Sequence, residues 1–194
     1  MKKSIYKLLI IVLFTGIYAC EELESYGPMP EVEFVKVYLA DTIDALKNNV
    51  IHQKIYLNVI DGDGNLGLNK EDSSGNFSID SIYYHNLFLT VNYKDSTGNY
   101  NLLKDLSENL KYRIPYNKPV GQNKYLKAEI KVDLDIPKSY IKYDTIQYEF
   151  YVYDRELNKS NICKSCDIPI NLHGTVYADG NIKKVKEKED TKKQ

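Results

Sequence analysis

Residues 125–136 read YLKAEIKVDLDI, and this stretch indicates the fold more clearly than any other part of the chain. Apolar side chains occupy every second position from Leu126 to Ile136, and a charged side chain stands at each position between them. Successive side chains of a β-strand point to opposite faces of a sheet, so the alternation predicts a strand with one buried and one solvated face. Such half-buried strands are typical of antiparallel sheets.

Further strands are predicted on both sides of this stretch. The chain has 18 tyrosines and no tryptophan, and with frequent Ile, Val and Thr this composition favours strands over helices. Residues 100–112 fit either a short helix or an edge strand followed by a loop. Weaker alternation predicts strands at residues 31–39, 51–60, 82–93, 146–153 and 162–172.

About seven strands with no helices between them predict an all-β fold. We expect an immunoglobulin-like antiparallel β-sandwich over residues 31–174, with a closed β-barrel as the main alternative. The 194-residue chain is long enough for one good core and a small extra element.

The first 20 residues are typical of a secretory signal. Two lysines precede a short apolar run, which is too short to span a bilayer, and a small residue stands before Cys20. The segment Ile17-Tyr18-Ala19-Cys20 resembles a bacterial lipobox, which implies a signal peptide over residues 1–19 and lipidation of Cys20. The alternative is an ordinary signal peptide with Cys20 as a free thiol or half of a disulfide. Residues 20–30 are then an acidic tether.

Charge excludes one class of partner. The formal net charge is −1, and removal of the signal with its three lysines makes the remainder more acidic, so we expect no nucleic acid as a partner. The end of the chain differs, because residues 183–194 hold six lysines, three acids and one apolar residue. We expect residues 175–194 to be a disordered basic tail. A basic arm that touches anionic lipid headgroups or surface sugars is the functional alternative.

The loop after the second predicted strand, residues 61–67, reads DGDGNLG. Asp61, Asp63 and Asn65 place oxygen-bearing side chains at alternate positions on a glycine-rich backbone, an arrangement suited to calcium. It is not an EF-hand, since Leu66 stands where that loop needs glycine and Asp72 stands where it needs glutamate. The competing interpretation is a structural loop in which Asp and Gly serve the backbone turns.

The loop before the last strand bears on that choice. In a Greek-key sandwich it lies at the same end as the loop after the second strand. Asp154 could then supply a fourth oxygen to a metal site of Asp61, Asp63 and Asn65. Alternatively, Arg155 could form a structural ion pair with Asp61 or Asp63. An arginine at this place would repel a cation.

A resemblance follows from these motifs. A lipobox, a strand that ends in DGDGNLG, and the late segment FYVYDR over residues 150–155 followed by NKSN over residues 158–161 resemble a group of uncharacterised Bacteroidota lipoproteins. The resemblance implies an immunoglobulin-like sandwich and export to the cell envelope, and it implies no activity.

Two cysteines lie close together, at Cys163 and Cys166. A disulfide or two inert thiols is the main expectation for this pair in an exported protein. A metal site would need two further ligands, of which only His173 is near in sequence, and a redox pair would need a helix N-terminus.

The sequence contains no motif for catalysis, so we expect no catalytic residues and no enzyme. The expected protein is lipid-anchored in the outer membrane, at the cell surface or the periplasmic face, and acts as a binding or adhesion module for a protein or glycan. The alternative is a structural or accessory subunit of an outer-membrane complex, with calcium as a possible stabilising ion. A hydrolase is the third hypothesis.

Overall fold

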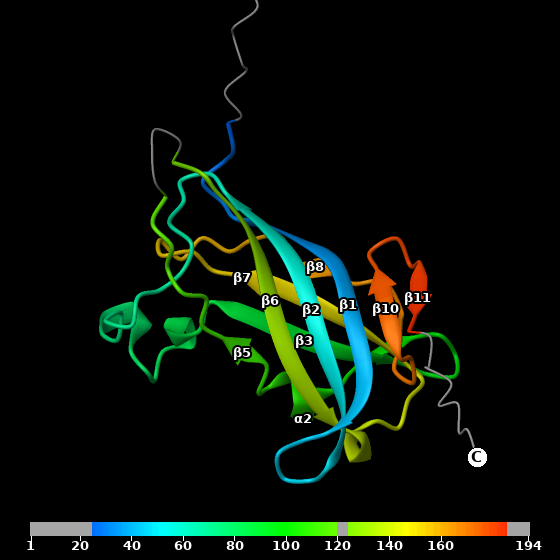
Figure 1. The fold of residues 1–194 in the computed structure, drawn as a ribbon. Coiled ribbons are helices and arrows are strands. Elements are labelled where there is room, and N and C mark those ends of the chain that lie inside the picture. Colours follow the sequence, from blue (N-terminus) through cyan, green and yellow to red (C-terminus); the bar gives the residue numbers. More distant parts are fainter. Residues whose placement is uncertain (1–24, 120–123, 186–194) are drawn as a thin grey trace, which may run out of the picture.

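Two antiparallel sheets pack face to face in the computed structural model of the chain, which describes residues 25–119 and 124–185 (Figure 1). The predicted all-β sandwich is thereby confirmed. The signal segment, Cys20 and the last nine residues lie outside the described residues. None of the described helices is long and apolar enough to cross a membrane.

The first sheet contains the longest strands, in the order β11-β10-β1-β2-β6. Every neighbouring pair is antiparallel, and all of β6 pairs with β2 without a register shift. A β-bulge between Phe34 and Lys36 bends β1. The strands are β1 (Glu31–Ile43), β2 (Asn49–Asp61), β6 (Leu126–Pro137), β10 (Gly174–Tyr177) and β11 (Ile182–Lys184).

The second sheet is built on two long strands with short strands along their edges. Its path is β4-β3-β7-β8, with β5 paired to β3 and β9 paired to β7. The strands are β3 (Leu87–Lys94), β4 (Tyr100–Leu102), β5 (Lys111–Tyr112), β7 (Thr145–Val152), β8 (Cys163–Lys164) and β9 (Ile168–Pro169). The helical segments are η2 (Gly75–Phe77), η3 (Ile82–Tyr84), α2 (Lys104–Ser107) and η4 (Lys138–Tyr140).

The core lies between the sheets and follows the alternation of the strands. In β7 every second side chain from Ile146 to Val152 is buried, as the period of two requires. Phe34 of the first sheet stacks on Phe150 of the second, with ring centroids 6.0 Å apart. Tyr148 is also fully buried, and its hydroxyl donates to Gln53 Oε1 at 2.8 Å, so its polar end is satisfied inside the core.

Several predicted boundaries are wrong at the C-terminal side. The predicted closing strand over residues 162–172 is divided into β8 and β9, because Ser165 folds back to bond Tyr148 and Pro169 ends the second piece. Residues 174–184 are part of the sandwich and are not a disordered tail. Val176 in β10 is fully buried, which explains why this polar-looking segment is ordered.

The predicted tether is also partly ordered. Within residues 25–30, Tyr26 packs edge-on against Tyr125 with ring centroids 5.2 Å apart, and Pro30 is buried. Residues 82–93 begin as the helix η3 and become a strand only at Leu87, and residues 100–112 contain two short strands with α2 between them. The ambiguity at residues 100–112 therefore reflects real alternation of strand and helix.

Candidate metal centre

The two predicted loops meet at one end of the sandwich, near the top of Figure 1. Asp61 is the last residue of β2, and Asp154 stands two residues after the end of β7. One carboxylate oxygen from each of Asp61, Asp63 and Asp154 lies within 4.8 Å of the other two. The expectation that these loops come together is confirmed.

The loop after β2 has the shape it does because its backbone folds around Asp61. The Leu66 N–H donates to Asp61 Oδ2 at 2.7 Å, and the Leu66 side chain is buried in the core. Gly64 and Gly67 adopt φ angles of 68° and 105°, which favour glycine. A side chain at Gly67 would also collide with the carbonyl of Pro115.

Two asparagines hold the other carboxylates in place. Asn65 donates to Asp63 through its backbone N–H at 3.2 Å and through its Nδ2 at 2.9 Å. Asn158 holds Asp154 in the same way, with both distances 2.8 Å. These local turns fix the two carboxylates without neutralising their charge, since amide donors carry no charge.

Two buried oxygens in this cluster have no hydrogen-bond partner among the described residues, namely Asp61 Oδ1 and Asn65 Oδ1. Asp61 is fully buried, and no Lys, Arg or His in the described part of the chain forms an ion pair with Asp61, Asp63 or Asp154. The pKa of Asp61 is raised to about 6, mainly by burial and also by the nearby carboxylates of Asp63 and Asp154, although the Leu66 N–H bond lowers it. A buried carboxylate of this kind needs a proton or a cation.

The arrangement fits a hard cation that takes oxygen ligands. Calcium binds six to eight oxygens with flexible geometry, and this loop end offers three carboxylates and the Asn65 amide oxygen. Zinc prefers nitrogen and sulfur, and the cluster contains no histidine or cysteine. The residues predicted as ligands, Asp61, Asp63, Asn65 and Asp154, therefore remain together as one candidate calcium site.

The predicted ion pair of Arg155 with Asp61 or Asp63 is wrong. Arg155 points to Asp72 instead, where Nη1 donates to Oδ2 at 2.6 Å and Nη2 to Oδ1 at 3.2 Å. This bond holds the pKa of Asp72 below its usual range. Arg155 also lies over the Tyr116 ring at 5.0 Å. The arginine that was expected to repel a cation is therefore occupied elsewhere.

Asp72 is a partner that sequence reasoning missed, because the EF-hand comparison assigns it only the twelfth position of that loop. Residues 69–72 form a turn, in which the Asn69 N–H donates to Asp72 Oδ2 at 2.7 Å. Arg113 donates to the backbone carbonyls of Asn69 and Asp72. Two arginines therefore fasten this turn next to the acidic cluster.

Of the two expected states of Cys163 and Cys166, a disulfide or two thiols, the structure has the thiols. Their sulfurs face different neighbours, because the Phe34 N–H donates to Cys163 Sγ at 3.1 Å and Cys166 Sγ contacts the Tyr177 carbonyl at 3.2 Å. Burial raises the pKa of both thiols. Thiols held in this way link the two sheets and are poor nucleophiles.

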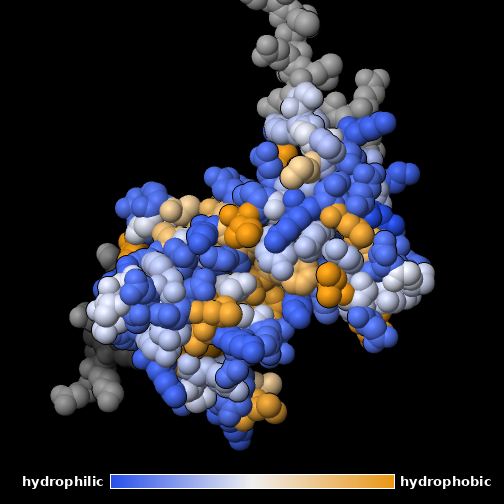
Figure 2. All heavy atoms as spheres, turned by 180° about the vertical axis from the view of Figure 1, so that it is seen from behind, coloured by the Kyte–Doolittle hydropathy of each residue, from blue (hydrophilic) through white to orange (hydrophobic). Residues whose placement is uncertain are grey.

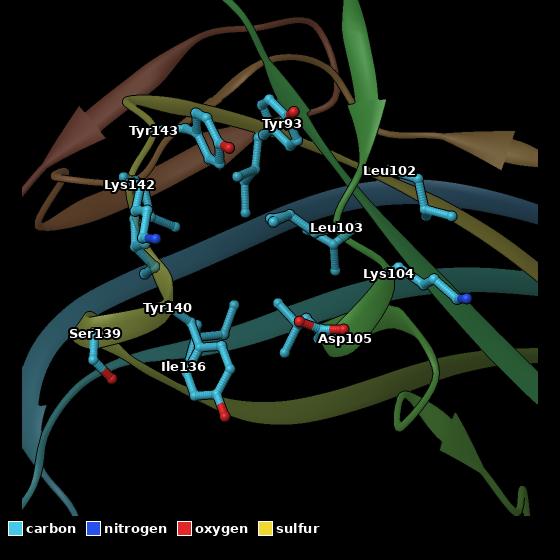
Figure 3. Close-up of a pocket in the computed structure, with 15 residues that line it drawn as sticks. Tyr93, Leu102, Leu103, Lys104, Asp105, Ile136, Ser139, Tyr140, Lys142 and Tyr143 are labelled. Atoms are coloured by element: carbon cyan, nitrogen blue, oxygen red, sulfur yellow. The ribbon is translucent and has the colours of Figure 1, made fainter.

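An apolar pocket of about 500 Å³ lies at the opposite end of β6. Figure 3 shows Leu103 and Tyr140 on opposite sides of it, with the rings of Tyr93 and Tyr143 side by side above. These two rings are stacked, with centroids 3.6 Å apart. On the rear face of the molecule, small groups of apolar side chains alternate with hydrophilic ones (Figure 2).

No known protein family, curated protein or solved structure matches the chain.

Proposed function

We propose that the protein is a calcium-stabilised, non-catalytic binding module that is attached to the cell envelope by a lipid on Cys20. The observation that carries the calcium site is the fully buried Asp61, whose carboxylate lies within 4.8 Å of two others and whose Oδ1 has no hydrogen-bond partner among the described residues.

Electrostatics supports a cation at this place over a purely structural loop. A structural loop of Asp and Gly needs each buried carboxylate oxygen to accept a backbone or side-chain donor. Asp61 meets that need at Oδ2 only, and three acids within 4.8 Å repel one another when ionised. A divalent cation removes both problems, because it satisfies the orphaned oxygens and cancels the repulsion.

The sequence supports the anchor. The charged start, the short apolar run and the lipobox-like segment before Cys20 point to export and lipidation. The position of Tyr26 agrees with this placement, because Tyr26 packs on Tyr125 at the loop end of the sandwich and lies six residues after Cys20. We infer an outer-membrane location, on either its outer or its periplasmic face.

Thermal unfolding of the full chain in detergent tests the calcium site. Calcium that binds only the folded state must raise the unfolding midpoint, and we expect a rise in millimolar calcium relative to a chelator. Asp63→Ala should abolish the rise. The matched control is Asp95→Ala, which removes a carboxylate from another turn that bonds Thr97 and Asn99 but has no acidic neighbour in the cluster.

The results separate the two interpretations of the loop. An equal midpoint with and without calcium would contradict the site. A rise that survives Asp63→Ala would place calcium elsewhere on the chain.

Protease treatment of intact cells that carry a tagged copy tests the anchor. Loss of the tag from intact cells indicates the outer surface, and protection until the outer membrane is opened indicates the periplasm. Cys20→Ala should release the protein from the membrane fraction, and unchanged fractionation would contradict lipidation.

A further inference from the structure

We propose that the protein forms a two-fold symmetric dimer in which strand β6 pairs with β6 of a second copy, joining the two first sheets into one. This inference goes beyond the proposed function and does not depend on calcium.

Strand β6 is the long strand at one edge of the first sheet. It has 12 residues and pairs on one side with β2, and no described residue pairs with its other side (Figure 1). The other outer strands of both sheets, β4, β5, β8, β9 and β11, have two or three residues each. Proteins usually protect edges with short strands, bulges, proline or charged side chains. Strand β6 has no bulge and no proline before its last residue, so its charged side chains are the device that decides which strand can pair with it.

The backbone groups that face this open edge can be identified. The N–H groups of Val32 and Phe34 donate away from β2, to Asn161 and Cys163. In an antiparallel pair, backbone hydrogen bonds to the neighbouring strand come from alternate residues. Because Val32 and Phe34 bond away from β2, the odd-numbered residues of β2 opposite them do not bond β1. The odd-numbered residues of β2 therefore bond β6, and its even-numbered residues bond β1. The even-numbered residues of β6 therefore bond β2. The backbone groups of the odd-numbered residues point to the open edge, and before the terminal Pro137 these residues are Lys127, Glu129, Lys131, Asp133 and Asp135.

The charges on these residues select one register for a second copy. With Ile130 opposite Ile130 of the second copy, Lys127 lies opposite Asp133 and Glu129 lies opposite Lys131. Two-fold symmetry repeats both pairs in the other half of the interface. Each of the four cross-strand pairs then joins opposite charges, and side chains directly opposite one another in a sheet are close enough to interact.

Neighbouring registers fail the same test. Moving the partner by two residues in one direction places Glu129 opposite Glu129 and Lys127 opposite Lys131. Moving it by two residues in the other direction places Lys131 opposite Lys131 and Glu129 opposite Asp133. Like charges directly opposite are destabilising, so the sequence of β6 is self-complementary at one of these three registers.

The inner face of β6 leaves room for the partner strand. Val132, Leu134 and Ile136 are buried, whereas Leu126, Ala128 and Ile130 are only partly buried. These three residues border an apolar groove of about 490 Å³ on the open side of the sandwich. In the proposed register, Ala128 and Leu126 lie opposite Val132 and Leu134 of the second copy, so the less buried half of each strand meets the more buried half of the other.

Charge reversal tests the register. Sedimentation velocity of the protein in density-matched detergent should show a species of twice the monomer mass, in exchange with monomer. Lys131→Glu alone and Glu129→Lys alone each place like charges opposite and should weaken dimerisation by at least ~10-fold. The double variant restores opposite charges and should restore the dimer. Monomer at all concentrations, or a double variant as weak as the single ones, would overturn the proposal.

Disulfide trapping gives an independent measurement on a chain whose native cysteines are replaced by serine. Ile130→Cys places one sulfur opposite its copy on the two-fold axis and should cross-link under oxidation. Ala128→Cys is the matched control, because it lies on the same face but opposite Val132 of the second copy. Equal cross-linking of both variants, or none of Ile130→Cys, would contradict the register.

Discussion

Asp61→Asn is the change that best separates a calcium site from a structural loop. The substitution keeps the size of the side chain and an oxygen that can accept the Leu66 N–H, but it removes the charge. If Asp61 serves only the loop backbone, the variant loses stability with or without calcium. If Asp61 is a calcium ligand, the variant gains stability without the ion and loses the response to it.

The size of the effect follows from the pKa of Asp61. Its folded-state pKa of about 6 lies above the ordinary value of 3.8, so the folded chain binds more protons than the unfolded chain between these values. The free energy of unfolding of the calcium-free protein therefore falls as the pH rises through this window. A difference of about two units corresponds to up to about 3 kcal/mol at pH 7, or a midpoint change of roughly 6–12 °C for a domain of this size.

The assay is urea unfolding of the full chain, followed by tyrosine fluorescence, at pH 4 and pH 7. In chelator at pH 7, Asp61→Asn should be more stable than the wild type, and the two should converge at pH 4. In millimolar calcium at pH 7, the wild type should be the more stable of the two. A variant that is less stable than the wild type by the same amount in chelator and in calcium would refute the assignment of Asp61 as a ligand.

Three further predictions concern the framework. Arg155→Ala should cost about 1–3 kcal/mol, because it strands the Asp72 carboxylate, and chemical unfolding should show that the calcium response is unchanged; loss of that response would place Arg155 in the site. Tyr148→Phe should cost about 1–2 kcal/mol, because Gln53 Oε1 then lies buried without a donor, and an unchanged urea midpoint would contradict this bond. Val176→Ala should cost about 2 kcal/mol in the same assay, and a neutral effect would contradict the position of β10 in the core.

The long strands could be predicted from the sequence because alternation alone determines them. The pattern from Leu126 to Ile136 needs no knowledge of distant residues, and the same holds for β7. The segment from residue 162 onward could not be predicted in this way. Its strands are two to four residues long, and they are ordered by bonds to partners far along the chain, such as Ser165 to Tyr148.

Part of the candidate site could also be predicted from the sequence, and part of it could not. Asp61, Asp63, Asn65 and Asp154 could be brought together from the sequence, because a strand order that places two loops at one end needs only the count of strands. The partner of Arg155 depended on how residues 69–72 turn, and composition does not determine that geometry. The choice between a disulfide and two thiols at Cys163 and Cys166 could not be made from the sequence for a similar reason, since each sulfur is oriented by its own backbone neighbour.

The edge strand shows what becomes visible only when topology is known. From the sequence alone, the charges of β6 indicate the solvated face of one strand. Their order becomes informative only with the topology, which places β6 at the edge of the sheet with its odd-numbered backbone groups facing outward. A second copy of β6 can then lie opposite with each charge facing its opposite.

Isothermal titration calorimetry of calcium into the full chain, stripped of metal by a chelator, tests the central claim most directly. The account predicts binding at one site per chain, with the release of protons near pH 6 because Asp61 must lose its proton to bind the ion. The same titration of Asp61→Asn should show no binding, while Asp95→Asn should bind as the wild type does. No heat of binding in the wild type, or equal binding by Asp61→Asn, would contradict the calcium site.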